Sequence, residues 1–149
     1  MNASKALDPR GLRQGAAVAL VFAVPFAIAA AVVNSNDDDS PWVAVLWLGA
    51  LGGFILGGAI AAWVQQTGLP IAHGMVCAGG TYLVTQAILT VVRLARGEEV
   101  SWIAIFFTFT MVMFAGLVGG ALAGAMRKRG IVPGALSIAR ESHTEGGNR

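Results

Sequence analysis

One segment of the chain carries most of the side chains that could do chemistry. Between residues 70 and 92, His73, Cys77, Thr81 and Thr85 recur every four residues and therefore follow one slowly turning stripe of a helix. Polar groups inside an apolar layer must face protein or water, so this stripe indicates an interior face, a polar cavity or a partner surface. The candidate polar site comprises His73, Thr81, Tyr82, Thr85, Gln86 and Thr108.

His73 is the member of this set that could relay protons near neutral pH. It follows Pro70 by three residues, which places it only about 5 Å from the start of its helix. This shallow depth favours an interfacial histidine held by water, Gln14 or Gln66 over a proton relay. Both interpretations stay open.

Gln86 and Thr108 lie deeper in their segments, at similar distances from the opposite end. An interhelical hydrogen bond between them, worth about 0.6 kcal/mol on membrane averages, explains both residues without transport. The alternative is a substrate site at the interface of two repeats, where transporter sites tend to lie. Its residues are Tyr82, Thr85, Gln86 and Thr108.

Four long apolar segments must position these side chains. The chain has 149 residues, of which 56% are hydrophobic and 12% charged, whereas a typical soluble domain has about 25% charged residues. A stretch of about 20 apolar residues spans the hydrocarbon core of a bilayer. We therefore predict an all-α polytopic membrane protein with spans at 13–33, 42–64, 70–92 and 101–126, an N-terminal segment 1–12 and a disordered tail 130–149.

The distribution of cations predicts the orientation in the membrane. Eight cations flank one side of the four spans and two flank the other. The eight are Lys5, Arg10, Arg13, Arg127, Lys128, Arg129, Arg140 and Arg149, and the two are Arg93 and Arg96. Because cytoplasmic flanks carry the excess of Lys and Arg, both termini are expected in the cytoplasm, with the protein in a bacterial plasma membrane.

Glycines recur with one spacing in the second and fourth segments. Gly49, Gly53 and Gly57 stand four residues apart, and Gly116, Gly120 and Gly124 repeat that spacing 67 residues on. Bare glycine faces let two helices approach closely in lipid. The full set of predicted packing glycines is Gly49, Gly52, Gly53, Gly57, Gly116, Gly119, Gly120 and Gly124. This pattern predicts two tandem α-hairpins in the same orientation, a parallel repeat whose two glycine faces meet inside one protomer. The alternative places those faces against a partner.

Composition also limits the chemistry. The four predicted spans contain neither Asp nor Glu, so we expect no enzyme, no catalytic residues and no cofactor. Asp37, Asp38 and Asp39 could offer oxygen ligands to a cation, but a solvated loop is favoured and no metal site is predicted. Cys77, the single cysteine, is expected to be a buried small side chain. The cations lie beside apolar spans rather than along one polar surface, so nucleic acid is not an expected partner.

The glycine-rich spans invite comparison with two families of four-span bacterial proteins. Small multidrug exporters need a glutamate in the first span, which this chain lacks. Double-barrelled fluoride channels have little charge bias, unlike this chain. Over residues 12–129 the chain resembles uncharacterised small four-span bacterial integral membrane proteins with paired glycine-rich helices, and this resemblance implies no functional residues. We expect an interaction, assembly or regulatory component of a membrane complex, in contact with lipid and with a membrane-protein partner or further copies of itself. The alternative is a small oligomeric transporter or channel.

Overall fold

The computed structural model describes residues 7–131 apart from 38 and 98. These residues form four helices: α1 (Pro9–Asn36), α2 (Pro41–Val64), α3 (Pro70–Ala95) and α4 (Trp102–Lys128). Each is long and apolar enough to cross a membrane, which confirms the prediction of an all-helical chain with four candidate spans. Most of the predicted disordered tail 130–149, and the start of the predicted N-terminal segment, lie outside the described residues.

Local signals explain where the helices begin. Pro9, Pro41 and Pro70 each occupy the first turn of a helix, where the missing N–H breaks no helical hydrogen bond. The Asp8 carboxylate accepts a hydrogen bond from the backbone of Arg10 at 3.0 Å and so caps α1. Because of this cap, α1 starts at Pro9, four residues before the predicted span.

The side chains are distributed inside out relative to a soluble protein. Ile103, Phe106 and Trp42 are 85%, 72% and 64% exposed, respectively. The buried positions are mostly glycine and alanine, such as Ala61 and Ala78, which are fully covered. Large apolar side chains on the outside and small ones inside are the arrangement that hydrocarbon solvent permits, since lipid does not penalise exposed apolar surface.

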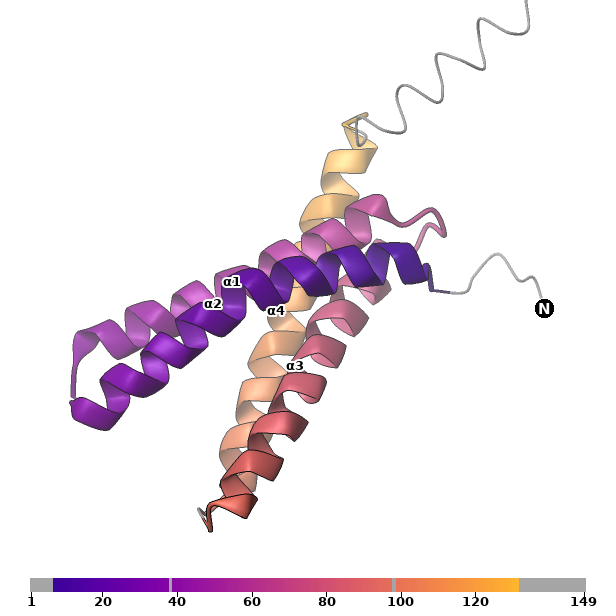
Figure 1. Cartoon of the computed structure of the whole chain (residues 1–149). Helices are drawn as coiled ribbons and strands as arrows, with labels where there is room; N and C mark the ends of the chain where they lie inside the picture. Colours follow the sequence, from indigo (N-terminus) through magenta and orange to yellow (C-terminus); the bar gives the residue numbers. More distant parts are fainter. Residues whose placement is uncertain (1–6, 38, 98, 132–149) are drawn as a thin grey trace, which may run out of the picture.

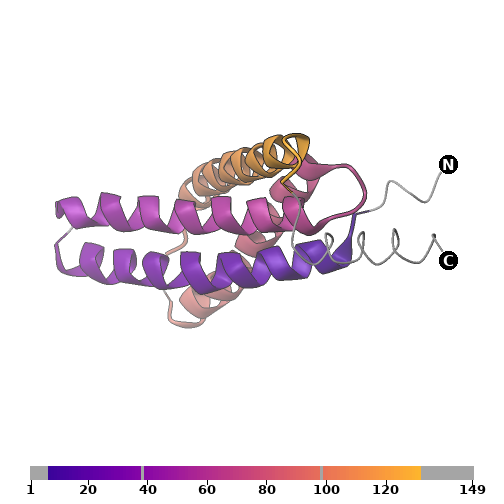
Figure 2. The ribbon, with the colours of Figure 1, turned by 90° about the horizontal axis from the view of Figure 1, so that it is seen from above.

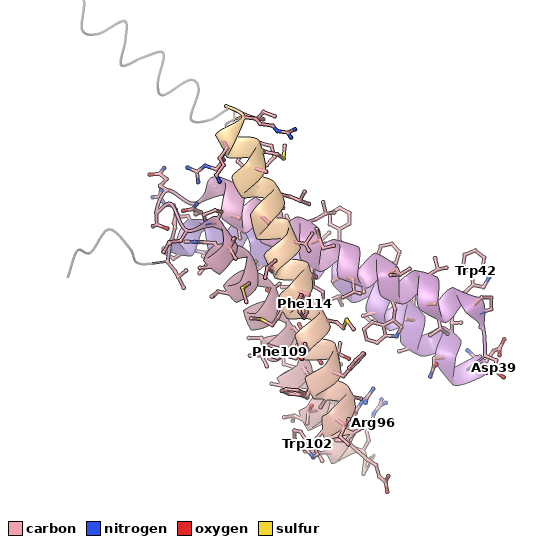
Figure 3. The ribbon with its side chains drawn as sticks, turned by 180° about the vertical axis from the view of Figure 1, so that it is seen from behind. Asp39, Trp42, Arg96, Trp102, Phe109 and Phe114 are labelled. Atoms are coloured by element: carbon pink, nitrogen blue, oxygen red, sulfur yellow. The ribbon has the colours of Figure 1, made fainter. Side chains whose placement is uncertain are left out.

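The helices form two antiparallel hairpins, α1–α2 and α3–α4, that cross each other near one end and diverge towards their loops (Figures 1 and 2). Asp39 and Trp42 lie at the tip of the first hairpin, and Arg96 and Trp102 lie at the separate tip of the second (Figure 3). Helix α2 packs against all three other helices, whereas the described backbones of α1 and α4 do not come close to each other. The bundle is therefore open between the two tips.

Gly49, Gly53 and Gly57, the evenly spaced glycines of α2, face α1 and not α4. A Cβ atom added at Gly53 would lie 2.6 Å from the backbone nitrogen of Ala23, and one at Gly57 would lie 2.7 Å from the Cβ of Ala19. A Cβ at Gly49 would meet the Phe26 ring at 2.6 Å. The glycine face thus allows the closest approach within the first hairpin.

Gly116, Gly120 and Gly124, the evenly spaced glycines of α4, likewise face α3. A Cβ at Gly116 would lie 2.6 Å from the carbonyl oxygen of Gly74, and one at Gly120 would lie 2.7 Å from that of Pro70. A Cβ at Gly124 would meet the Pro70 ring at 3.2 Å. The prediction that the two glycine faces meet each other is therefore wrong. Short loops join each glycine-rich helix to an antiparallel neighbour, and that neighbour takes the bare face.

The hairpins contact each other through Gly58 of α2 and through Gly119 of α4, the second of which is among the predicted packing glycines. A Cβ at Gly58 would lie 3.2 Å from the Cα of Gly116, and one at Gly119 would lie 2.8 Å from the backbone nitrogen of Ala59. The hairpins therefore cross with backbone close to backbone. Gly52, also predicted as a packing residue, has nothing within 4 Å of an added Cβ, because it lies on an open part of the α2 surface.

Candidate functional site

A cleft of about 170 Å³ lies between the two hairpins, beyond the point where they cross, and is lined by all four helices. We name it the inter-hairpin cleft. Its polar lining residues are Thr81, Tyr82, Thr85, Gln86, Arg93 and Thr108. Five of the six residues of the predicted polar site thus line one hollow. His73 does not, and Arg93 was not among the predicted members.

Tyr82 forms a rigid part of the cleft wall. Its hydroxyl donates a hydrogen bond to the carbonyl oxygen of Ile105 at 3.1 Å, which ties α3 to α4. Its ring lies edge-on to that of Phe54, with centroids 6.5 Å apart, and 6.0 Å from that of Phe109. Since the donor is already used, the Tyr82 oxygen has only acceptor capacity left, and the Thr108 side chain already lies within hydrogen-bond reach of it.

The remaining polar side chains of the cleft differ in whether their hydrogen-bonding groups have partners. The Thr85 hydroxyl donates to the carbonyl oxygen of Thr81 at 2.9 Å, within its own helix. Gln86 is half-buried, yet its amide makes no hydrogen bond to any residue that the structure describes. The predicted bond between Gln86 and Thr108 is not formed, because the hairpin α3–α4 is closed by Tyr82 instead. Gln86 therefore presents an unused amide to the cleft.

His73 has a different surrounding. It is fully buried at the start of α3, where its Nε2 accepts a hydrogen bond from the backbone N–H of Asp8 at 2.8 Å. Its Nδ1 lies 2.8 Å from the carbonyl oxygen of Leu69 and, since Nε2 acts as an acceptor, carries the proton and donates to that oxygen. Both ring nitrogens are engaged with backbone, so the predicted partners Gln14 and Gln66 are wrong. A backbone N–H partner has no side-chain signature in a sequence.

Gln65 is a buried polar residue that lies just after the predicted span 42–64 and was not among the candidate site residues. Its side-chain oxygen accepts hydrogen bonds from the hydroxyl of Thr67 at 3.0 Å and the backbone N–H of Gly68 at 2.8 Å. Its backbone oxygen accepts from the guanidinium of Arg127 at 2.8 Å. This joins the end of α2 to the end of α4, close to where His73 joins α1 to α3. The described ends of the chain thus lie at a polar, closed base of the bundle.

Among the residues that the structure describes, no group of three or more His, Cys, Asp or Glu side chains is placed to hold a metal ion. Comparison of the chain with known protein families, with curated proteins and with solved structures found no match.

Proposed function

We propose that this chain is a multi-pass component of a bacterial plasma-membrane complex, with a role in interaction, assembly or regulation rather than in catalysis. The inter-hairpin cleft is its binding surface, and the occupant is a transmembrane helix of a partner protein. The observation that carries this proposal is Gln86, a half-buried amide that lines the cleft and bonds to no described residue.

The chemistry of the cleft walls supports a helix as occupant. One wall carries Ala23, Ala27 and Ala31 of α1, spaced one turn apart, and the other carries Gln86 of α3. Interfaces between transmembrane helices are rich in small residues that allow close approach, and in amides that bond across the interface. Small-molecule pockets span about 300–1,000 Å³, so a cleft of about 170 Å³ favours the side of a helix over a bulky substrate.

The proposed orientation places both termini and the α2–α3 loop in the cytoplasm. Arg10, Arg13, Arg127, Lys128 and Arg129 all belong to the base of the bundle, and cytoplasmic flanks carry such cations. The helices have 24–28 residues, or about 36–42 Å, against about 30 Å of hydrocarbon. This excess length lets both hairpins tilt, as their diverging tips require.

The two hairpins are proposed to be tandem repeats, but with a spacing different from the 67 residues of the glycine pattern. Gly15 packs on the Gly57 carbonyl of the first hairpin as Gly74 packs on the Gly116 carbonyl of the second. Each member of the second pair lies 59 positions after its counterpart. Equivalent contacts at one constant spacing support descent from a single hairpin.

Photo-crosslinking in native membranes tests the proposed partner. A photoreactive residue placed at Gln86 or at Ala31 should give an adduct with a different polypeptide. The matched control is Ile88, which is 61% exposed on the same helix as Gln86 but lines neither hollow, and it should give none. Equal amounts of adduct at Ile88 and Gln86 would contradict the proposal that the partner helix binds in the inter-hairpin cleft.

The convergence of Thr81, Tyr82, Thr85, Gln86 and Thr108 on one hollow favours a second candidate, a small oligomeric transporter or channel with its polar site in the cleft. The same experiment separates the two. Adducts at Gln86 and Ala31 that contain only a second copy of this chain favour the oligomeric transporter.

A further inference from the structure

A second hollow, of about 330 Å³, runs along the surface between α1 and α3. We name it the α1–α3 groove. Leu12, Ala16 and Leu20 of α1 and Val76, Gly80 and Val84 of α3 give it apolar walls. From Leu12 to Leu20 the groove extends about 12 Å at 1.5 Å per residue, which is most of one leaflet of a bilayer about 30 Å thick. Its dimensions suit a length of acyl chain.

Apart from Arg13, the groove has few polar atoms, and the Cys77 and Thr85 side chains bond within the protein. The Cys77 sulfur lies 3.7 Å from the Gly57 carbonyl oxygen and 3.9 Å from that of Leu12. The Thr85 hydroxyl donates to the Thr81 carbonyl oxygen. Gly80 has nothing within 4 Å of an added Cβ, so the groove is open above it. The open surface is therefore apolar.

One charged side chain lines the groove, at the base of the bundle. Arg13 is exposed, and it makes no ion pair or hydrogen bond with any residue that the structure describes. An arginine guanidinium binds phosphate with paired hydrogen bonds, and basic pockets between transmembrane helices bind anionic headgroups. A cation at the interfacial end of an acyl-sized groove is complementary to a phospholipid.

We infer that the α1–α3 groove binds one anionic phospholipid, with the headgroup phosphate at Arg13 and an acyl chain along Leu12 to Leu20. The groove adjoins the inter-hairpin cleft, with which it shares Leu20, Thr81 and Thr85, but the inference does not depend on the proposed function. The expected ligand is a lipid rather than free phosphate, because most of the groove surface is apolar.

Native mass spectrometry of the full chain in mild detergent tests the site, with phosphatidylglycerol or phosphatidylcholine added. The unchanged protein should retain one phosphatidylglycerol in preference to phosphatidylcholine. Arg13→Gln should weaken phosphatidylglycerol binding about five-fold, which corresponds to one cation at the membrane surface. Lys128→Gln removes a cation from the same end of the bundle but outside the groove, and should leave binding unchanged.

Gly80→Leu supplies the second arm, because it fills the groove without touching Arg13. It should reduce the retention of both lipids. Gly52→Leu is the matched control, since Gly52 is equally open and lies on α2, and it should bind as the unchanged protein does. Circular dichroism melting establishes that both leucine variants fold. Unchanged phosphatidylglycerol binding by Arg13→Gln and Gly80→Leu, or displacement of the lipid by inorganic phosphate alone, would overturn the inference.

Discussion

The backbone nitrogen of Asp8 donates a hydrogen bond to Nε2 of His73 at 2.8 Å, joining the cap of α1 to the first turn of α3. The bond between Arg127 and the Gln65 carbonyl oxygen joins α4 to α2 in the same way. Both bonds cross from one hairpin to the other, and both lie at the base. The hairpins are therefore held together at the base, while their tips diverge.

Replacing His73 should destabilise the fold. His73→Leu leaves the Asp8 N–H without its partner, at a cost of about 1–3 kcal/mol, whereas the Leu69 carbonyl still accepts from the backbone N–H of residue 73. Thermal unfolding in detergent measures this cost. Gln14→Leu, an exposed change on the neighbouring helix, is the control. Equal melting temperatures for the two variants would show that the His73 bonds contribute nothing.

Replacing Arg127 tests the second bond at the base. Arg127→Gln should lower the free energy of unfolding. A hydrogen bond to a charged group contributes about 1.5–3 kcal/mol, and the expected loss is smaller than this because the Arg127 side chain is partly exposed. Arg129→Gln removes the same charge from an exposed position close by. A denaturant titration that found the two variants equally stable would contradict the role of the Gln65 carbonyl.

The glycine contacts within the hairpins are expected to be intolerant of side chains. Gly57→Leu and Gly116→Leu would drive a side chain into the facing backbone of Gly15 and Gly74, at a cost of about 1–3 kcal/mol or more. Gly52→Leu meets open space and should melt like the unchanged protein. If Gly57→Leu folded normally and changed only the oligomeric state, α2 would not pack on α1 through this face.

Tyr82 and Gln86, two of the polar residues of α3 that line the cleft, should respond to substitution in opposite ways. Tyr82→Phe removes the donor to the Ile105 carbonyl and should cost about 1 kcal/mol of stability. Gln86→Leu removes an amide that bonds to no described residue, so the isolated protein should be equally or more stable. Co-purification should show the reverse, with partner lost in Gln86→Leu and kept in Tyr82→Phe. A large loss of stability in Gln86→Leu would show that the amide is already paired.

The proposed orientation can be measured with an impermeant thiol reagent on intact cells. Asp39→Cys and Glu99→Cys, one in each hairpin loop, should react from outside, and Lys128→Cys should react only after lysis. Cys77 is buried, so the unchanged protein gives no background. Labelling at position 128 in intact cells would reverse the orientation.

Local chemistry allowed sequence analysis to predict the helices. Apolar length marks each span, and Pro41 and Pro70 mark two of the starts through the proline's own geometry. The polar stripe could also be predicted from the sequence, because residues spaced four apart lie on one face of a helix regardless of which element packs against that face. That is why Thr81 and Thr85 were predicted to share a surface, and both line one cleft, whereas His73 and Cys77 of the same stripe do not line it.

What lies opposite each face was decided only by the tertiary structure. A run of glycines allows close approach to any helix, so the spacing of Gly53 and Gly57 could not distinguish α1 from α4 as the partner. The same holds for His73, whose partner is the backbone N–H of Asp8, a group that every residue except proline possesses. The sequence of side chains determines the local pattern of each helix. Which neighbouring backbone each helix face packs against depends on how the two hairpins cross.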